Sequence, residues 1–357
     1  MSRRIKKYKK YLGVLPVLAF LCLLAGMFVF RQTYGQKQQV LSPIVDCSTR
    51  TNDFDCWGER YKAMVQQQSP QAAFADIKQA YERHDFVRSQ CHQIVHVLGR
   101  EAAVKYSDTV SAYDQGDNFC WSGYYHGVME GVAAKIGPEK LMATLPDICA
   151  GAKTKQAYGF YHYNCVHGLG HGLMAVNSNK LFEVLDMCKK FTDSWERESC
   201  YGGTFMENIM GEENKDNHPT VYFKADDALY PCTVVSVEYK QQCYMMQTSH
   251  ALKVTNSDFS RVFALCAQVE KPLDETCYQS LGRDASGRSI SNAAVAKTTC
   301  LLGPTQSAQS NCIIGAVKDF VSYYHSDKQG QELCHSLDQK ILTETCLSAA
   351  SSIYSTF

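Results

Sequence analysis

The spacing of the cysteines is the feature that most constrains the fold of this chain. Four intervals between neighbouring cysteines are 22 or 23 residues long: Cys165–Cys188, Cys243–Cys266, Cys277–Cys300 and Cys312–Cys334. Five others are 11 or 12 residues long: Cys188–Cys200, Cys232–Cys243, Cys266–Cys277, Cys300–Cys312 and Cys334–Cys346. One long and one short interval together give a period of 34 or 35 residues, which is the length of a helical hairpin in repeat proteins. The interval that does not fit contains the polar run 211–219, where we predict a loop insertion.

The residues within each repeat unit predict two helices. In the segment 256–266, Phe259, Val262 and Phe263 form one apolar helical stripe, and the segment 177–188 has the same pattern. We expect the Asn and Ser residues before these stripes to cap the second helix of the unit. The third residue after a leading cysteine is usually Gly, Ser or Ala, which favours close approach of neighbouring helices. No β-hairpin pattern is present, so we predict an all-α protein.

The remaining segments fit the same description less closely. Residues 91–149 are expected to form less regular copies of the unit, and residues 57–90 an amphipathic pair of helices.

The first forty residues predict export. Residues 3–10 carry six cationic side chains, and residues 11–30 carry no charge. Twenty apolar residues at about 1.5 Å per residue span a hydrocarbon core of about 30 Å, and a basic flank stays in the cytoplasm. A cleaved signal peptide is the alternative, although the apolar run is too long for one and no small-residue cleavage site follows. The expected organisation is a cytoplasmic basic segment (1–10), a transmembrane signal anchor (11–30), a stalk (31–46) and an extracytoplasmic helical-repeat domain (47–357).

Export makes disulfides the expected state of the cysteines. Cys22 lies in the predicted membrane span, which leaves sixteen of the seventeen cysteines in an oxidising compartment. Pairing within each hairpin, such as Cys165 with Cys188, leaves two cysteines unpaired. Pairing of neighbours closes all sixteen, and we favour it: 47–56, 91–120, 149–165, 188–200, 232–243, 266–277, 300–312 and 334–346.

This layout resembles the TPR/Sel1-like disulfide-stapled helical-hairpin repeat proteins over roughly residues 91–357. The resemblance implies a solenoid of stapled hairpins, which would follow the predicted N-terminal transmembrane helix. It concerns architecture only, because the W…L-G…Y…A…F…P pattern of the TPR repeat is missing and the cysteine spacing differs from that of Sel1-like proteins. No function follows from it.

The histidines are concentrated in one part of the chain and predict a metal site. Six of the eleven lie between residues 92 and 171, and four of these form two H-x-x-x-H pairs. Residues four apart share one face of a helix, as metal-ligand pairs on helices do. The predicted ligands are His126, His167, His171 and Glu130, followed by His96 and His92, with Glu207 as an outer candidate.

Position relative to the leading cysteine predicts which side chains face together. His126 and His171 both fall at position 6, whereas His92 and His96 fall at positions 1 and 5. This offset corresponds to a rotation of about 100°, so we expect that His92 and His96 face elsewhere or that the register shifts in the first unit. A polar band continues at position 7 with Glu207, His250, Asp284 and Asp319.

Two functions are compatible with these patterns. A divalent transition metal (Zn, Fe, Mn or Cu) bound by His and Glu would make the protein a possible metalloenzyme, with Glu130 as a ligand or as the general base. The absence of an H-E-x-x-H motif excludes that class of zinc protease. The alternative is a non-catalytic scaffold that binds a protein, peptide or glycan in its groove. Nucleic acid is not an expected partner, because 36 basic residues balance 36 acidic ones. Isolated histidines are expected to be structural: His84, His218, His325 and His335.

Overall fold

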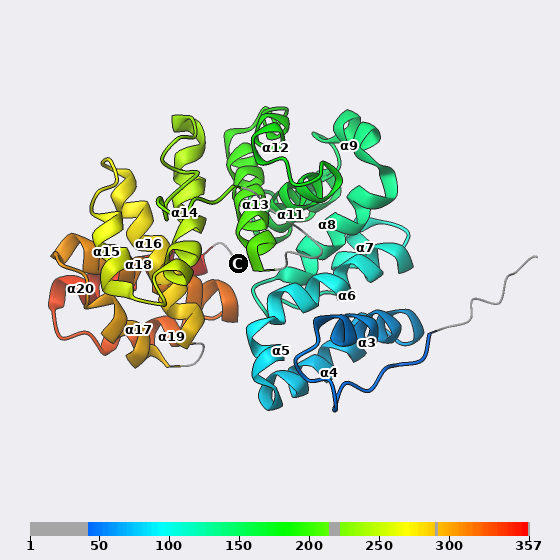
Figure 1. Cartoon of the computed structure of the whole chain (residues 1–357), viewed down its shortest axis with the longest axis horizontal. Coiled ribbons are helices and arrows are strands. Elements are labelled where there is room, and N and C mark those ends of the chain that lie inside the picture. Colours follow the sequence, from blue (N-terminus) through cyan, green and yellow to red (C-terminus); the bar gives the residue numbers. More distant parts are fainter. Residues whose placement is uncertain (1–41, 214–221, 290–291, 356–357) are drawn as a thin grey trace, which may run out of the picture. The chain divides into compact units, whose positions relative to one another are not determined.

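The computed structural model describes residues 42–213, 222–289 and 292–355, and these are helical without any strand (Figure 1). The chain divides between Pro43 and Ile44, and the description below concerns the unit that begins at Ile44. The predicted basic segment, the membrane span with Cys22 and most of the stalk lie outside the described residues. Within the described ranges, no helix has the length and apolar character needed to cross a bilayer.

The predicted hairpins are confirmed in the second half of the chain, where a long helix is followed by a short one that ends at or beside a cysteine. They are α11 (Phe160–Val176) with α12 (Leu181–Cys188), α14 (Val237–Val254) with α15 (Phe259–Cys266), α16 (Leu273–Ser289) with α17 (Ala293–Cys300), and α18 (Gln306–Tyr324) with α19 (Lys328–His335). Two further long helices are α13 (Ser194–Glu213) and α20 (Lys340–Tyr354). Helix α13 extends into the polar run predicted to be a loop, and the rest of that run up to Pro219 lies outside the described residues.

The first half is less regular, as expected. The amphipathic N-terminal pair is present as α3 (Phe54–Gln67) and α4 (Pro70–Arg83), followed by the short α5 (Asp85–Ser89). The segment between Cys91 and Cys149 forms two long helices and shorter ones around them: α6 (Cys91–Lys105), α7 (Thr109–Tyr113), α8 (Gly123–Ile136) and α9 (Pro138–Thr144), with α10 (Ala150–Lys155) after it.

The turn between the helices of a hairpin differs from the prediction. Asn256 and Ser257 do not cap α15; they adopt left-handed backbone conformations with φ of 53° and 66°. The amide of Ser257 donates to the carbonyl of Leu252 at 2.6 Å, which closes the end of α14. Asp258 is the cap, and its carboxylate accepts from the amide of Arg261 at 3.0 Å. Asn tolerates the left-handed region, so this dipeptide reverses the chain and leaves capping to the next residue.

The disulfides confirm pairing of neighbours for all eight bridges: Cys47–Cys56, Cys91–Cys120, Cys149–Cys165, Cys188–Cys200, Cys232–Cys243, Cys266–Cys277, Cys300–Cys312 and Cys334–Cys346. Four of these bridges, at Cys188, Cys266, Cys300 and Cys334, join the end of a short helix to the next long helix. They therefore connect one hairpin to the next rather than closing a hairpin on itself. Each bridge contributes about 2–4 kcal/mol to stability by restricting the unfolded chain.

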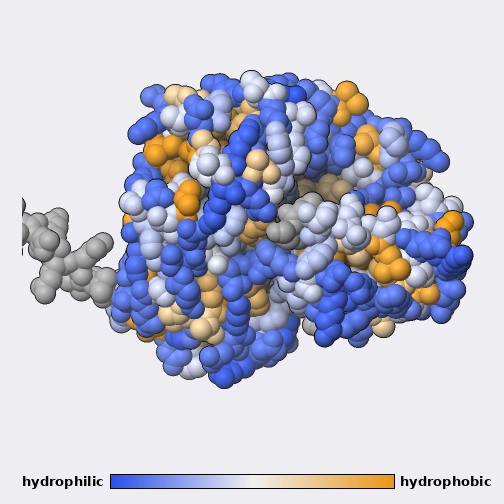
Figure 2. Space-filling view, turned by 180° about the vertical axis from the view of Figure 1, so that it is seen from behind, coloured by the Kyte–Doolittle hydropathy of each residue, from blue (hydrophilic) through white to orange (hydrophobic). Residues whose placement is uncertain are grey.

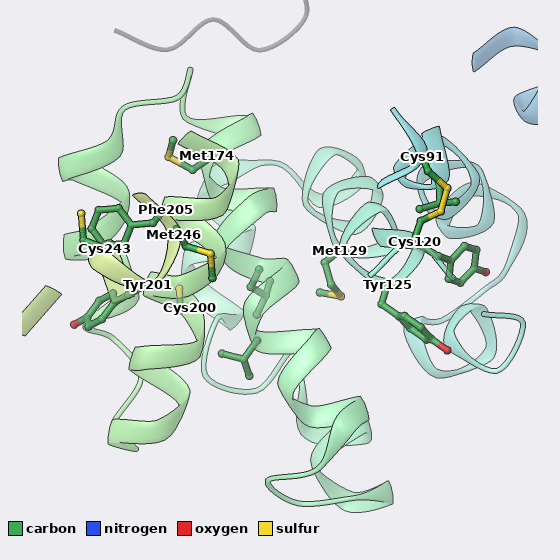
Figure 3. Packing of buried hydrophobic residues seen from close by; sticks show 14 of the residues in the cluster. Cys91, Cys120, Tyr125, Met129, Met174, Cys200, Tyr201, Phe205, Cys243 and Met246 are labelled. Atoms are coloured by element: carbon green, nitrogen blue, oxygen red, sulfur yellow. A yellow bond between two sulfur atoms is a disulfide. The ribbon is translucent and has the colours of Figure 1, made fainter. Parts of the chain in front are cut away.

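The long helices pack against one another in chain order, from α6 through α8, α11, α13, α14, α16 and α18 to α20. Buried aromatic, sulfur-containing and aliphatic side chains fill the spaces between them, among them Tyr125 and Met129 on α8 and Tyr201 and Phe205 on α13 (Figure 3). The face shown in Figure 2 is mostly hydrophilic, with apolar residues in small separate groups. Beneath this surface, the buried side chains form one hydrophobic core that continues from each helix to the next.

Glycines set the distance between several of these helices. A Cβ atom on Gly99 of α6 would lie 2.0 Å from the carbonyl oxygen of Tyr124, and one on Gly127 of α8 would lie 2.1 Å from that of His96. Only glycine permits this backbone contact. The same arrangement recurs at Gly170 with Gly203 and at Gly282 with Gly315. Gly203 and Gly315 occupy the third position after a cysteine, where the sequence predicted close approach.

The segment before α8 also contacts a helix that follows it by about two hundred residues. The side-chain amide of Asn118 donates to the carbonyl of Tyr323 at 2.9 Å. The indole N–H of Trp121 lies 3.4 Å from Asp319 Oδ2, and its ring lies 4.8 Å from that of Tyr323. The chain thus returns to its own first half at α18, a contact that the repeat pattern did not predict.

We expect Gly315→Ala to destabilise the protein by about 1–3 kcal/mol, because the added methyl group would lie 1.9 Å from the carbonyl oxygen of Gln279. Gly58→Ala on α3 is the matched control. Its methyl group meets no described atom nearer than 3.9 Å, so helix propensity should leave stability unchanged or raise it by up to about 1 kcal/mol. Denaturant unfolding of both variants measures the difference. Equal midpoints for the two variants would contradict the packing interpretation.

Candidate metal centre

Three successive helices bring the predicted ligands together. Helix α6 provides His92 and His96, α8 provides His126 and Glu130, and α11 provides His167 and His171. All six are at most 4% exposed except His92, which is partly buried. Three groups of these side chains have potential ligand atoms within 4.8 Å of one another: His92 with His96 and His126, His126 with His167 and His171, and His96 with Glu130 and His171.

The expectation that His92 and His96 face elsewhere is wrong, and the alternative of a register shift describes the first unit. Cys91 is the first residue of α6, whereas Cys120 precedes α8. Residues 120–122 adopt left-handed conformations with φ of 54–60° before that helix begins. The same number of residues after the cysteine therefore corresponds to different positions around the axes of α6 and α8. The glycine contact between these helices places His96 beside α8.

Outer hydrogen bonds fix the orientation of three imidazole rings. His92 Nδ1 donates to the carbonyl of Cys120 at 2.8 Å, and His96 Nδ1 donates to Glu130 Oε1 at 2.5 Å. His171 Nδ1 donates to Glu207 Oε2 at 2.7 Å. Histidines that bind metals commonly use one ring nitrogen for such a bond and the other for the metal. Glu207, predicted as an outer candidate, lies in this supporting position.

The inner nitrogens of the α6 pair face each other. His92 Nε2 lies 3.2 Å from His96 Nε2, and the Nδ1 atom of each ring is already a donor in an outer bond. Without a further proton, two lone pairs would point toward one another. A proton on one of the nitrogens or a metal ion satisfies this arrangement. A tetrahedral zinc ion with Zn–N distances of about 2.0–2.1 Å holds its nitrogen ligands about 3.4 Å apart, which is close to the separation found.

His126 lies at the centre of the imidazole cluster, which we define as His92, His96, His126, His167 and His171. Its ring stacks on that of His171 with centroids 4.7 Å apart and an interplanar angle of 15°. It lies 4.8 Å from the ring of His167, 5.3 Å from that of His92 and 5.5 Å from that of His96. Its buried Nδ1 has no hydrogen-bond partner in the described part of the chain. A buried imidazole with an unused nitrogen is costly unless another group occupies it.

The carboxylate of Glu130 has both oxygens in use. Oε2 accepts from Arg100 Nη1 at 2.5 Å, and Oε1 accepts from His96. Burial alone would raise the pKa of Glu130, but His96 and Arg100 hold it well below its ordinary value. Glu130 is thus an ionised acceptor that orients His96, and it remains near enough to His96 and His171 to be a ligand. Its predicted role as a general base stays a prediction.

A small open hollow of about 20 Å³, with room for about one water molecule, adjoins the carboxylate side of the cluster. Its walls include Gln93, His96, Arg100, Glu130 and Glu207. A water molecule in this hollow would lie beside one histidine of the cluster and both supporting carboxylates.

Arg100 and Tyr163 were missed by the sequence analysis. The hydroxyl of Tyr163 lies 3.1 Å from His167 Nδ1, so it gives His167 an outer partner as the carboxylates do for His96 and His171. Both missed residues extend the i, i+4 rows: Arg100 follows His96 by four residues, and Tyr163 precedes His167 by four. Helical spacing could have identified them.

The remaining polar positions have structural partners away from the cluster. Asp284 accepts hydrogen bonds from Thr248 and Ser249, and Asp319 accepts one from Ser286. His250 stacks on Phe223 with centroids 4.2 Å apart.

Comparison of the chain with protein-family models, with curated proteins and with solved structures finds no match. The site is therefore interpreted from its own geometry.

The metal-free protein should lose stability as the pH falls below about 6.5. Burial, reinforced by the neighbouring histidines, lowers the pKa of His92, His126 and His167 well below the ordinary value. The unfolded chain therefore takes up protons that the folded chain excludes, and each such group contributes up to about 1.4 kcal/mol per pH unit. Burial raises the pKa of Asp319 to about 6. This single group increases stability as the pH falls below 6, so it offsets only part of the loss caused by the three histidines.

Denaturant unfolding at pH 7.5, 6.5 and 5.5 in the presence of a chelator measures this dependence. His126→Gln should reduce the loss of stability per pH unit by about the contribution of one histidine, because the glutamine side chain does not titrate. The same midpoint at all three pH values would show that the cluster does not exclude protons.

Proposed function

We propose that this chain is a membrane-anchored, extracytoplasmic helical-repeat protein that binds a divalent transition metal through its imidazole cluster. The observation that carries the proposal is the pair of inner nitrogens of His92 and His96, 3.2 Å apart, on rings whose outer nitrogens are already in use. Several buried imidazoles around this pair supply further ligands. Among the candidate metals, imidazole donors favour Zn, Cu or Fe over Mn.

Metal-dependent catalysis is the more specific form of this proposal. A bound ion with an open coordination position would polarise a substrate or activate water. The hollow beside Glu130 offers a path to that position from the carboxylate side. Arg100 lies in its wall and would attract an anionic group, while Glu130 and Glu207 orient the histidines behind it.

The proposed location rests on the disulfides and on the N-terminal sequence. Eight bridges require an oxidising compartment such as the periplasm, the extracellular space or an organelle lumen. The apolar run 11–30, with its basic flank, would provide the anchor. The packing of the long helices in chain order is consistent with a solenoid. A non-catalytic binding scaffold is the function that would remain if no metal binds.

Elemental analysis of the full chain, produced in an oxidising compartment and purified in detergent, tests metal binding. After metal supplementation we expect at least one Zn, Cu or Fe ion per chain, and a lower metal content in the double variant His167→Ala/His171→Ala. His335→Ala is the control, since this side chain is exposed and distant in sequence. An unmodified protein without stoichiometric metal would leave only the scaffold function.

The supporting carboxylates give a second prediction. Glu207→Gln should weaken metal binding by about 10–100-fold, because the amide is a poorer acceptor for His171 Nδ1. The matched control is Glu196→Gln, which changes a carboxylate that accepts from His162 Nε2 at 3.0 Å outside the cluster. Competition with a chromophoric chelator measures both affinities. An equal loss in both variants would mean that Glu207 acts only through general stability.

A further inference from the structure

The number of imidazoles in the cluster exceeds what one ion can use. A four-coordinate metal ion has at most four protein ligands, yet five histidine rings lie together here. At least one buried ring would then keep an unused lone pair. Burying a polar atom without a partner costs free energy, and His126 Nδ1 is such an atom. This excess raises the question of how many ions the cluster binds, and the answer rests on the metal-binding function proposed above.

The histidines divide by helix into two pairs, and His126 contacts rings of both pairs. His92 and His96 come from α6, and His167 and His171 come from α11, so each pair has the i, i+4 spacing of a helical metal site. Helix α8 packs against both α6 and α11 (Figure 1). His126 on α8 belongs to both groups of potential ligands: one with the α6 pair and one with the α11 pair.

Each pair also has its own outer support. The carbonyl of Cys120 and the carboxylate of Glu130 hold the α6 pair, and both bonds use Nδ1. The hydroxyl of Tyr163 and the carboxylate of Glu207 hold the α11 pair in the same way. The Nε2 atoms of all four rings are thus the ones that would bind a metal ion, and each pair has outer hydrogen-bond partners of its own.

We propose that the cluster binds two metal ions rather than one. His92 and His96 hold one ion, His167 and His171 hold the other, and His126 is the ligand that they share. One nitrogen serves one ion, so His126 bridges through both ring nitrogens as an imidazolate and releases its N–H proton to solvent. The negative charges of this imidazolate, Glu130 and Glu207 offset part of the charge of the two ions.

The stoichiometry of the full chain separates the possible outcomes. Protein stripped with a chelator is dialysed against Zn²⁺, and bound zinc is measured against protein concentration. Two ions per chain are expected. One ion per chain would overturn the two-ion inference and leave the metal-binding function intact. No bound zinc would overturn both.

Variants of each pair locate the ions. His92→Ala/His96→Ala and His167→Ala/His171→Ala should each retain one zinc ion per chain, since each removes one half of the site. A single ion shared by both pairs would instead be lost in both variants, which would contradict the inference. The matched control is His162→Gln on α11, a buried histidine whose ring accepts from Tyr158 N at 3.1 Å and donates to Glu196; it should retain both ions.

Copper provides a test of the shared ligand that does not depend on variants. An imidazolate between two Cu²⁺ ions couples their unpaired electrons, so the integrated electron paramagnetic resonance signal of the loaded protein should fall below its copper content. A signal equal to the copper content would overturn the bridging role of His126. Circular dichroism melts of the variants show whether any loss of metal reflects loss of the fold.

Discussion

The close backbone contact between α6 and α8 is the constraint on which the site depends. Because Gly99 and Gly127 carry no side chain, the two helices approach until the carbonyl oxygen of His96 would touch any added Cβ. At that separation His96 reaches Glu130 across the interface. The same close contact at Gly170 and Gly203 brings together α11 and α13, the helices that carry the hydrogen-bonded pair His171 and Glu207.

A buried polar cluster of this size must be held by something other than its own contacts. Neutral imidazoles lose hydration on burial, and a group of them contributes little apolar packing. The disulfides offset this cost from outside the cluster, because they tie successive segments of the chain together. Cys91–Cys120 joins the start of α6 to the segment before α8, and Cys149–Cys165 anchors α11. The cysteines that hold the helices together and the histidines of the cluster are thus different residues of the same helices.

Much of this arrangement could be predicted from the sequence. The rest depended on the rotation of side chains about the helix axes and on contacts between distant helices. Cysteine spacing predicted the hairpins and was compatible with two pairing schemes, of which the favoured one, which pairs all sixteen cysteines, is observed. Histidine spacing selected side chains that the structure brings together. Position after the cysteine misplaced His92 and His96, because Cys120 lies in a left-handed segment outside its helix. Arg100 and Tyr163 carried a helical signal that was overlooked, whereas the contact between Trp121 and α18 has no counterpart in local sequence.

That contact has a consequence for how such a protein can change over time. In an open repeat array, hairpins can be duplicated or deleted because each unit touches only its neighbours. Here Asn118 and Trp121 meet Tyr323 and Asp319 across most of the array. An added or lost hairpin between them would displace one side of the contact by the width of a repeat. The contact therefore depends on the number of hairpins between α8 and α18.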